Sequence, residues 1–146
     1  MARRRLPSLL QEVAAAPGLV AEVVLLRGLL PVALERLPMD RLLRGLTPAA
    51  VRFGGRSEAA TLEAVERATE LVLRRVRVTR TTCMLRSLIR YRCLRERGVE
   101  VVFKMGLRER EGVMEGHAWI ELRGQPVLER ESTDYQVTFV YPPSAA

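Results

Sequence analysis

The chain has 146 residues, of which 48% are hydrophobic and 28% are charged. This length and composition exclude intrinsic disorder and predict one domain with a substantial buried core. The formal net charge is +7, and 23 of the 24 basic residues are arginines. Such a charge favours an acidic partner (a nucleic acid, an anionic membrane or an acidic peptide), and it is equally consistent with an arginine-rich genome.

The two cysteines, Cys83 and Cys93, are ten residues apart on one predicted helix. That spacing separates them by roughly 15 Å along the helix axis, so they cannot form a disulfide, and we expect free thiols in a reducing, cytoplasmic compartment. The basic N-terminus is followed too early by Gln11 and Glu12 for a secretion signal. Residues 19–37 are apolar but carry charges, so we expect no membrane span.

Residues 6–46 are rich in leucine and have a helical pattern. Pro17-Gly18 separates a short first helix from a longer one, which Pro31 starts afresh or kinks. Asp40 is predicted to N-cap a further helix over residues 41–46. We assign residues 1–50 to an N-terminal helical region. Three interpretations of this region are open. Its helices pack against the core, present a docking surface for a partner that is marked by Arg27, Arg36, Arg41 and Arg44, or lie on a membrane as a basic amphipathic helix does.

Residues 47–56 contain Gly54-Gly55 and are predicted to be a linker. A core of residues 57–141 follows, beginning with a helix that Ser57 caps. The apolar stripe of that helix has spacings of three and four residues and consists of Leu62, Val65, Ala68, Val72 and Val76. Residues 74–80 alternate basic and apolar residues without aromatics for base stacking, so we interpret them as a solvated connection.

Cys83 begins a predicted helix that runs to about Arg97 and ends at Gly98. Thr81 or Thr82 can cap this helix. The free N–H groups and the dipole at a helix N-terminus favour a thiolate, so Cys83 is a candidate nucleophile. Cys93, in mid-helix, is predicted to be a buried structural residue.

The last third of the chain is predicted to form antiparallel strands. Residues 99–108 alternate apolar and polar, and a charged turn over 109–115 leads to a strand over 117–122. Ala118, Ile120 and Leu122 should face inward, opposite His117, Trp119 and Glu121. Further strands cover 127–129 and 136–141. Helices followed by an antiparallel meander define an α+β fold.

His117 is the only histidine, and several acids could orient it. A three-residue hairpin loop over residues 122–124 would place Glu129 opposite His117, with Cβ atoms roughly 4.5–5.5 Å apart. A two-residue loop would instead place Arg130 there. Asp134 could serve only through a bulge or a returning loop, and Glu121 is a weaker candidate on the same strand. Cys83, His117 and Glu129 therefore form a candidate thiol nucleophile, base and orienting acid.

This arrangement resembles the transglutaminase-like branch of the papain-like fold. Two segments are similar to the lasso-peptide leader peptidases, namely Cys83-Met84-Leu85-Arg86-Ser87-Leu88 with Tyr91, Leu94 and Arg97-Gly98-Val99, and Gly116-His117-Ala118-Trp119-Ile120-Glu121 with Gly124 and Val127. The similarity covers about residues 57–141. The family usually has Asp as its third member, where this chain has Glu129.

The resemblance implies a cytoplasmic cysteine protease that cleaves a ribosomally made precursor peptide. A separate small leader-binding protein would present the leader, and an ATP-dependent cyclase would close the ring. The Cys83 backbone N–H is expected to form part of the oxyanion hole. One histidine and two cysteines make a metal site a poor prospect, and no cofactor is expected. The alternatives are acyl transfer of the transglutaminase or amidase type, and a non-enzymatic peptide- or nucleic-acid-binding module.

Overall fold

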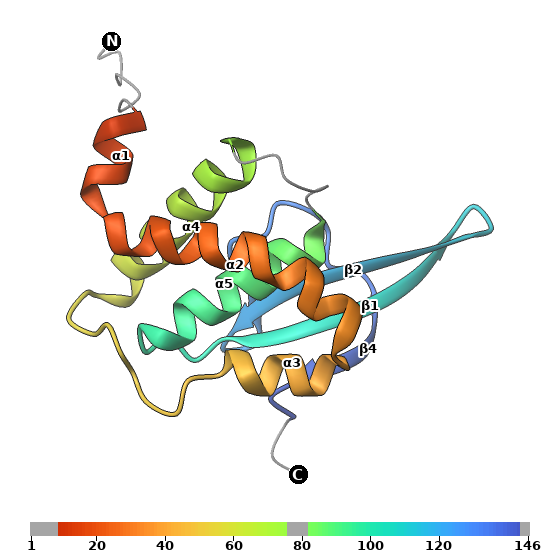
Figure 1. The fold of residues 1–146 in the computed structure, drawn as a ribbon. Helices are drawn as coiled ribbons and strands as arrows, with labels where there is room; N and C mark the ends of the chain where they lie inside the picture. The colour runs from red at the N-terminus through yellow and green to blue at the C-terminus, as the bar shows by residue number, and fades with distance from the viewer. Residues whose placement is uncertain (1–8, 76–81, 144–146) are drawn as a thin grey trace.

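The computed structural model describes residues 9–75 and 82–143 (Figure 1). Helices come first along the chain and strands follow, so the protein has the expected α+β architecture. The elements in chain order are α1 (Leu9–Ala15), α2 (Pro17–Arg36), α3 (Met39–Leu46), α4 (Glu58–Arg75), α5 (Cys83–Glu96), β1 (Val102–Arg110), β2 (Val113–Leu122), β3 (Gln125–Pro126) and β4 (Gln136–Tyr141).

One hydrophobic core joins the two halves of the chain. The N-terminal helices α2 and α3 contribute the buried residues Leu19, Val23, Leu30, Leu42, Leu43 and Leu46. These side chains pack in the same cluster as Val65 and Val72 of α4, Leu88 of α5 and Phe103 of β1. The helix α5 lies at the centre of this arrangement, because it packs against α2, α4, β1 and β2.

Three details of the N-terminal region differ from expectation. Pro31 lies inside α2, which continues through it to Arg36. Asp40 is in the first turn of α3 rather than at its N-cap, which is Pro38, whose fixed φ suits a helix start. Arg27 is 1% exposed, so it belongs to the interior and cannot mark a docking surface. Arg36, Arg41 and Arg44 are exposed, as expected.

The length and apolar composition of α2 would allow it to cross a membrane, and no other helix among the described residues meets that test. A core helix of a soluble protein meets the same test. Three of its residues, Leu19, Val23 and Leu30, are buried in the core, whereas Leu25 and Leu29 on another side are 60% and 57% exposed.

The helix caps follow local sequence. Ser57 Oγ accepts a hydrogen bond from the backbone N–H of Ala60 at the start of α4 (3.2 Å), and Thr82 Oγ1 accepts one from Leu85 at the start of α5 (3.2 Å). The chain leaves α5 through Gly98, which has a left-handed φ of 83°. The caps predicted at Ser57 and Thr82 and the glycine stop are thus confirmed. Val76, Thr81 and most of the 74–80 connection lie outside the described residues.

The sheet is antiparallel, with strand order β3-β2-β1-β4. Its two long central strands, β1 and β2, are joined by the two-residue turn Glu111-Gly112, and their hairpin extends well beyond the helices (Figure 1). Both turn residues have positive φ values, 52° and 77°, as a type I′ hairpin requires. The charged segment predicted as a turn over 109–115 is therefore mostly strand.

The hairpin between β2 and β3 also has a two-residue loop, because Leu122 pairs with Gln125 and Glu121 pairs with Pro126. The expected three-residue loop over 122–124 is wrong. Arg123 as well as Gly124 adopts a positive φ (50° and 77°), which gives the type I′ turn that matches the twist of the flanking strands. By simple continuation of this register, Arg130 and not Glu129 would lie opposite His117.

Candidate active site

The candidate nucleophile, Cys83, is the first residue of α5, directly after the capping residue Thr82. Backbone N–H groups in the first turn of a helix have no acceptor within the helix, so they can stabilise a thiolate or an oxyanion nearby. The Cys83 side chain is partly exposed and is a free thiol, whereas the Cys93 thiol is fully buried. Burial raises the pKa of the Cys93 thiol well above its ordinary value, with a further contribution from the charge of Glu22. The prediction that Cys93 is a buried structural residue is confirmed.

A hydrogen bond at the edge of β2 brings the beginning of α5 to the histidine strand. The carbonyl of Ile120 points toward β3, where it accepts from the N–H of Val127 (3.1 Å). Because carbonyl directions alternate along a strand, the carbonyl of Ala118 points to the same side. There β3 has ended, and Ser87 Oγ of α5 donates to Ala118 instead (2.9 Å). A helix residue thus takes the place of a strand partner one residue after His117.

Cys83 lies one helical turn before Ser87, on the same side of α5. In Figure 1 α5 and β2 run in the same direction. Cys83 precedes Ser87 on the helix, so it lies on the side of the Ser87–Ala118 contact where His117 precedes Ala118 on the strand. Between the described residues no hydrogen bond joins the Cys83 thiol to His117. Catalytic hydrogen bonds in unliganded structures are often long and shorten only when substrate binds.

His117 is buried on the sheet face opposite Ala118, and it contacts Glu129. Its Nε2 lies 3.1 Å from Oε2 of Glu129. The other carboxylate oxygen, Oε1, accepts from the backbone N–H groups of Arg130 (2.9 Å) and Glu131 (3.0 Å). The backbone that follows Glu129 therefore holds Oε1 in place, while Oε2 faces the imidazole. With Glu129 at Nε2, Nδ1 is the other ring nitrogen that can exchange a proton, and Glu131 Oε2 lies 3.8 Å from it.

Glu129 reaches His117 through a kink and not through strand register. Leu128 has a left-handed φ of 55°, which turns the chain after the short strand β3. The Leu128 carbonyl accepts from Nη1 of Arg90 (2.5 Å), a buried α5 residue whose Nη2 also contacts Glu70 (2.9 Å). The turn that presents Glu129 is thus anchored to the same helix that carries Cys83.

The other acids considered for His117 are engaged elsewhere. Glu121 accepts from Nε1 of Trp119 (3.0 Å) and forms an ion pair with Lys104 (2.7 Å). Asp134 is exposed, and its backbone N–H donates to Ser132 Oγ (3.3 Å). Among the described residues neither carboxylate contacts His117. The second carboxylate near the ring is Glu131, 3.8 Å from Nδ1 and largely exposed.

An aromatic layer holds the imidazole plane. Trp119 stacks beside His117 with ring centroids 5.9 Å apart, and Tyr135 stacks on it at 5.3 Å. Tyr135 can approach because the strand residue paired with His117 is Gly106. A Cβ at Gly106 would lie 2.7 Å from Cβ of Tyr135 and 2.9 Å from the carbonyl oxygen of Gln136. The register between β1 and β4 also shifts at this point, as in a β-bulge.

Sequence reasoning missed Ser87, Arg90, Gly106, Glu131 and Tyr135. Two of them carried a readable signal, because Cys83, Ser87 and Arg90 have the i, i+4, i+7 spacing of one helix face. Polar residues on the buried side of a helix need partners, and here the partners are the carbonyls of the two site segments. No comparable signal marks Gly106 and Tyr135, whose contact depends on the β4 register.

Within residues 9–75 and 82–143, no group of three or more Cys, His, Asp or Glu side chains could hold a metal ion. The chemistry that the described groups support is acid–base and nucleophilic. An imidazole held by a carboxylate can accept a proton and return it, and a thiol at a helix N-terminus is suited to attack a carbonyl carbon.

Comparison with known proteins gives one finding. A family model described as transglutaminase-like superfamily matches residues 24–140, which is most of the chain and includes Cys83, His117 and Glu129. The match begins inside α2 and ends inside β4. Comparison with curated proteins and with solved structures finds no match.

Proposed function

The chain belongs to the transglutaminase-like superfamily, and we propose that within it this protein is a cysteine peptidase that removes the leader from a lasso-peptide precursor. The observation that carries the enzymatic part is the contact between His117 Nε2 and Glu129. His117 lies on β2, and the edge of this strand is hydrogen-bonded to α5, the helix that begins with Cys83. The leader-peptidase part rests on the resemblance of the two sequence segments around Cys83 and His117.

In the proposed mechanism, Nδ1 of His117 accepts the Cys83 thiol proton while Glu129 stabilises the resulting imidazolium at Nε2. The thiolate attacks the carbonyl carbon of the scissile peptide bond, and the backbone N–H of Cys83 stabilises the oxyanion. Collapse of this intermediate expels the amine, which takes the proton from His117. Water, activated by the same imidazole, then hydrolyses the thioester, which releases the leader acid and regenerates the thiol.

The proposal extends to the partners and compartment of the protein. The precursor peptide is presented by a small leader-recognition protein, and the freed core amine passes to an ATP-dependent lasso cyclase. Free thiols at Cys83 and Cys93 suit a reducing cytoplasm. Docking of the leader or its carrier is assigned to the N-terminal helical region, residues 1–50.

The test is a cleavage assay with a short precursor and a leader-binding protein encoded by neighbouring genes, followed by mass spectrometry. We expect two products whose masses add up to the precursor plus one water, and none from a Cys83→Ala chain. Glutamine deamidation, or a product in which an added amine has replaced ammonia, would instead identify an amidase or transglutaminase. An unchanged precursor in the presence of every neighbouring partner contradicts the leader-peptidase assignment.

A further inference from the structure

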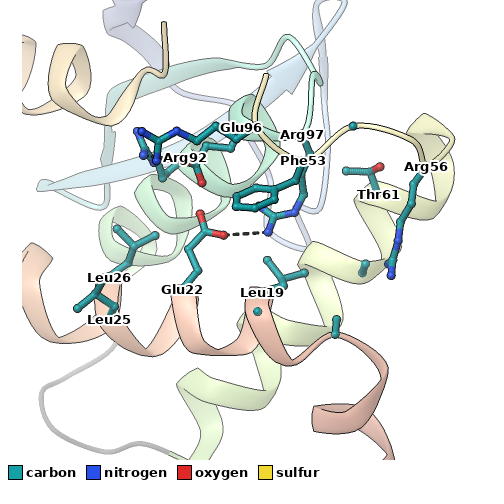
Figure 2. Close-up of a pocket in the computed structure, with 15 residues that line it drawn as sticks. Leu19, Glu22, Leu25, Leu26, Phe53, Arg56, Thr61, Arg92, Glu96 and Arg97 are labelled. Atoms are coloured by element: carbon teal, nitrogen blue, oxygen red, sulfur yellow. Dashed lines mark hydrogen bonds and ion pairs between the residues drawn. The ribbon is translucent and has the colours of Figure 1, made fainter. Parts of the chain in front are cut away.

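A concave site lies away from Cys83, where α2 meets the C-terminal end of α5 (Figure 2). Its volume is about 470 Å³, within the usual range of ligand pockets. We call it the α2–α5 cavity and define it by Glu22, Leu25, Arg52, Phe53, Arg56 and Arg92. The polar wall is completed by Glu96, the last residue of α5, and Arg97, its C-cap.

The polar wall contains more positive than negative charge. Glu22 is paired with Arg97 (2.9 Å), and Glu96 is paired with Arg92 and with Arg52 (3.4 Å). In Figure 2 the Glu22 and Glu96 carboxylates face each other. The cavity thus sets two carboxylates against four arginines, Arg52, Arg56, Arg92 and Arg97.

Two of these arginines are available to a ligand. Arg52 is largely exposed and has a single long contact to Glu96. Arg56 is exposed, and no ion pair or hydrogen bond of its side chain occurs among the described residues. By contrast Arg92 and Arg97 are held by carbonyl oxygens, those of Leu46 (3.0 Å) and Cys93 (2.9 Å), besides their carboxylates.

The remaining wall of the cavity is apolar and partly open. Phe53 is 55% exposed although the Arg97 guanidinium lies 4.9 Å from its ring centroid, and Leu25 on the opposite side is 60% exposed. Leu25 also belongs to an exposed apolar row along α2 that includes Val24, Leu29 and Val32. The cavity therefore opens onto an apolar helix face, and together they form an elongated surface with a cationic end.

We infer that the α2–α5 cavity and the adjoining row on α2 bind an acidic amphipathic peptide segment, with apolar side chains on Leu25 and Phe53 and carboxylates on Arg52 and Arg56. A nucleic acid fits less well, because Phe53 is the single aromatic residue of the cavity for base stacking and the adjoining row on α2 is apolar. An apolar groove with convergent charges is the form in which proteins bind amphipathic segments. The inference rests on the proposed function only in assigning that segment to the leader or its carrier.

The experiment uses two fluorescein-labelled peptides of twelve residues with one amphipathic leucine pattern, one with glutamates and one with glutamines at the polar positions. Fluorescence anisotropy with the full chain should show tight binding of the glutamate peptide and at least tenfold weaker binding of the glutamine peptide. Arg52→Gln/Arg56→Gln and Phe53→Ser should each weaken glutamate-peptide binding about tenfold. Arg52→Lys/Arg56→Lys should retain most of it. Thermal unfolding of every variant verifies that it is folded.

The matched control is Arg75→Gln/Arg110→Gln, which removes the same charge from exposed sites outside the cavity and outside α2, and should leave binding within about twofold of wild type. Equal losses in the control and cavity variants would show binding by net charge alone and overturn the inference. A competition experiment with random-sequence duplex DNA gives a second test. If the DNA displaces the peptide with equal potency from wild type and from Phe53→Ser, the inference is also overturned. Binding that disappears in Cys83→Ala would place the peptide at the active site instead. If the peptide still binds to Cys83→Ala but wild type does not cleave the precursor, the proposed function is refuted and this inference is retained.

Discussion

His117 and Glu129 are in contact although they are not cross-strand neighbours. The last paired residues of β2 and β3 are Glu121 and Pro126, and the chain reaches His117 only after the left-handed turn at Leu128. The Arg90 guanidinium fixes the carbonyl of that turn. The Glu129 carboxylate is therefore positioned from α5, the helix that also carries Cys83, so one element places two members of the candidate triad.

Replacing Glu129 by Gln should lower kcat/KM for precursor cleavage by roughly 10²- to 10³-fold, because the imidazolium loses its charged partner. Glu129→Asp should retain partial activity. Glu121→Gln and Asp134→Asn are the matched controls, since neither carboxylate contacts His117 among the described residues. A larger loss in Asp134→Asn than in Glu129→Gln would show that the kinked turn rearranges when substrate binds.

Iodoacetamide should alkylate Cys83 at least ten times faster than Cys93. The Cys83 thiol is partly exposed at a helix start, whereas burial and the charge of Glu22 raise the pKa of the Cys93 thiol. Peptide mapping of the native protein after timed alkylation measures both rates. Cys83→Ala should remain folded and react slowly, and Cys93→Ala should react like wild type. Similar rates at the two thiols would exclude Cys83 as an activated nucleophile.

Gly106→Ala should impair activity and destabilise the protein by about 1–3 kcal/mol, the usual cost of overpacking. The new methyl group would lie 2.7 Å from Tyr135 and would push it from the His117 ring. The control is Gly45→Ala in α3, where nothing lies within 4 Å and the change should stabilise by about 1 kcal/mol. Denaturant unfolding and kcat measure both effects. A Gly106→Ala chain with wild-type stability and turnover would contradict the close packing of Tyr135.

Glu96 should make the folded protein less stable as the pH rises from about 4.5 to about 7. Burial, and then the hydrogen bond to Glu22, raise the pKa of Glu96 to about 7. The folded state therefore binds a proton that the unfolded state releases near pH 4.5, and this stabilisation is lost as the pH rises through 7. Glu96→Gln should flatten the profile of unfolding free energy between pH 5 and pH 8, while the exposed Glu100→Gln should not. Parallel profiles for wild type and Glu96→Gln would contradict the raised pKa of Glu96.

Features that depend on neighbouring residues could be predicted from sequence. The caps at Ser57 and Thr82, the glycine stop after α5 and the alternating faces of β2 follow from local propensities and spacing. The contact of Glu129 with His117 was also predicted, but from a hairpin register that the structure contradicts. Two compensating features, a shorter loop and a kink at Leu128, produce the same neighbour.

Features that depend on tertiary packing could not be predicted. The close approach of Tyr135 to Gly106 requires the β1–β4 register shift, which has no sequence marker. The burial of Arg27, which composition suggested for the surface, depends on how α2 lies against α4 and α5. The burial of such residues depends on which surfaces pack together in the folded protein. A single sequence shows that a side chain is charged but not which surface it will contact.

The shared core described above predicts that this chain folds in an all-or-none manner. Leu19, Val23 and Leu30 of α2 are buried in the same cluster as residues of α4, α5 and β1, so removal of α2 would expose the interior of the half that carries Cys83 and His117. We expect heat denaturation to show one transition, with equal calorimetric and van't Hoff enthalpies and coincident loss of helix signal and Trp119 fluorescence. Two separated transitions would show instead that the N-terminal helices melt independently. If the chain is a single cooperative unit, a chimaera that takes α2 from a related protein must keep apolar residues at these buried positions, whatever the exposed face of that helix binds.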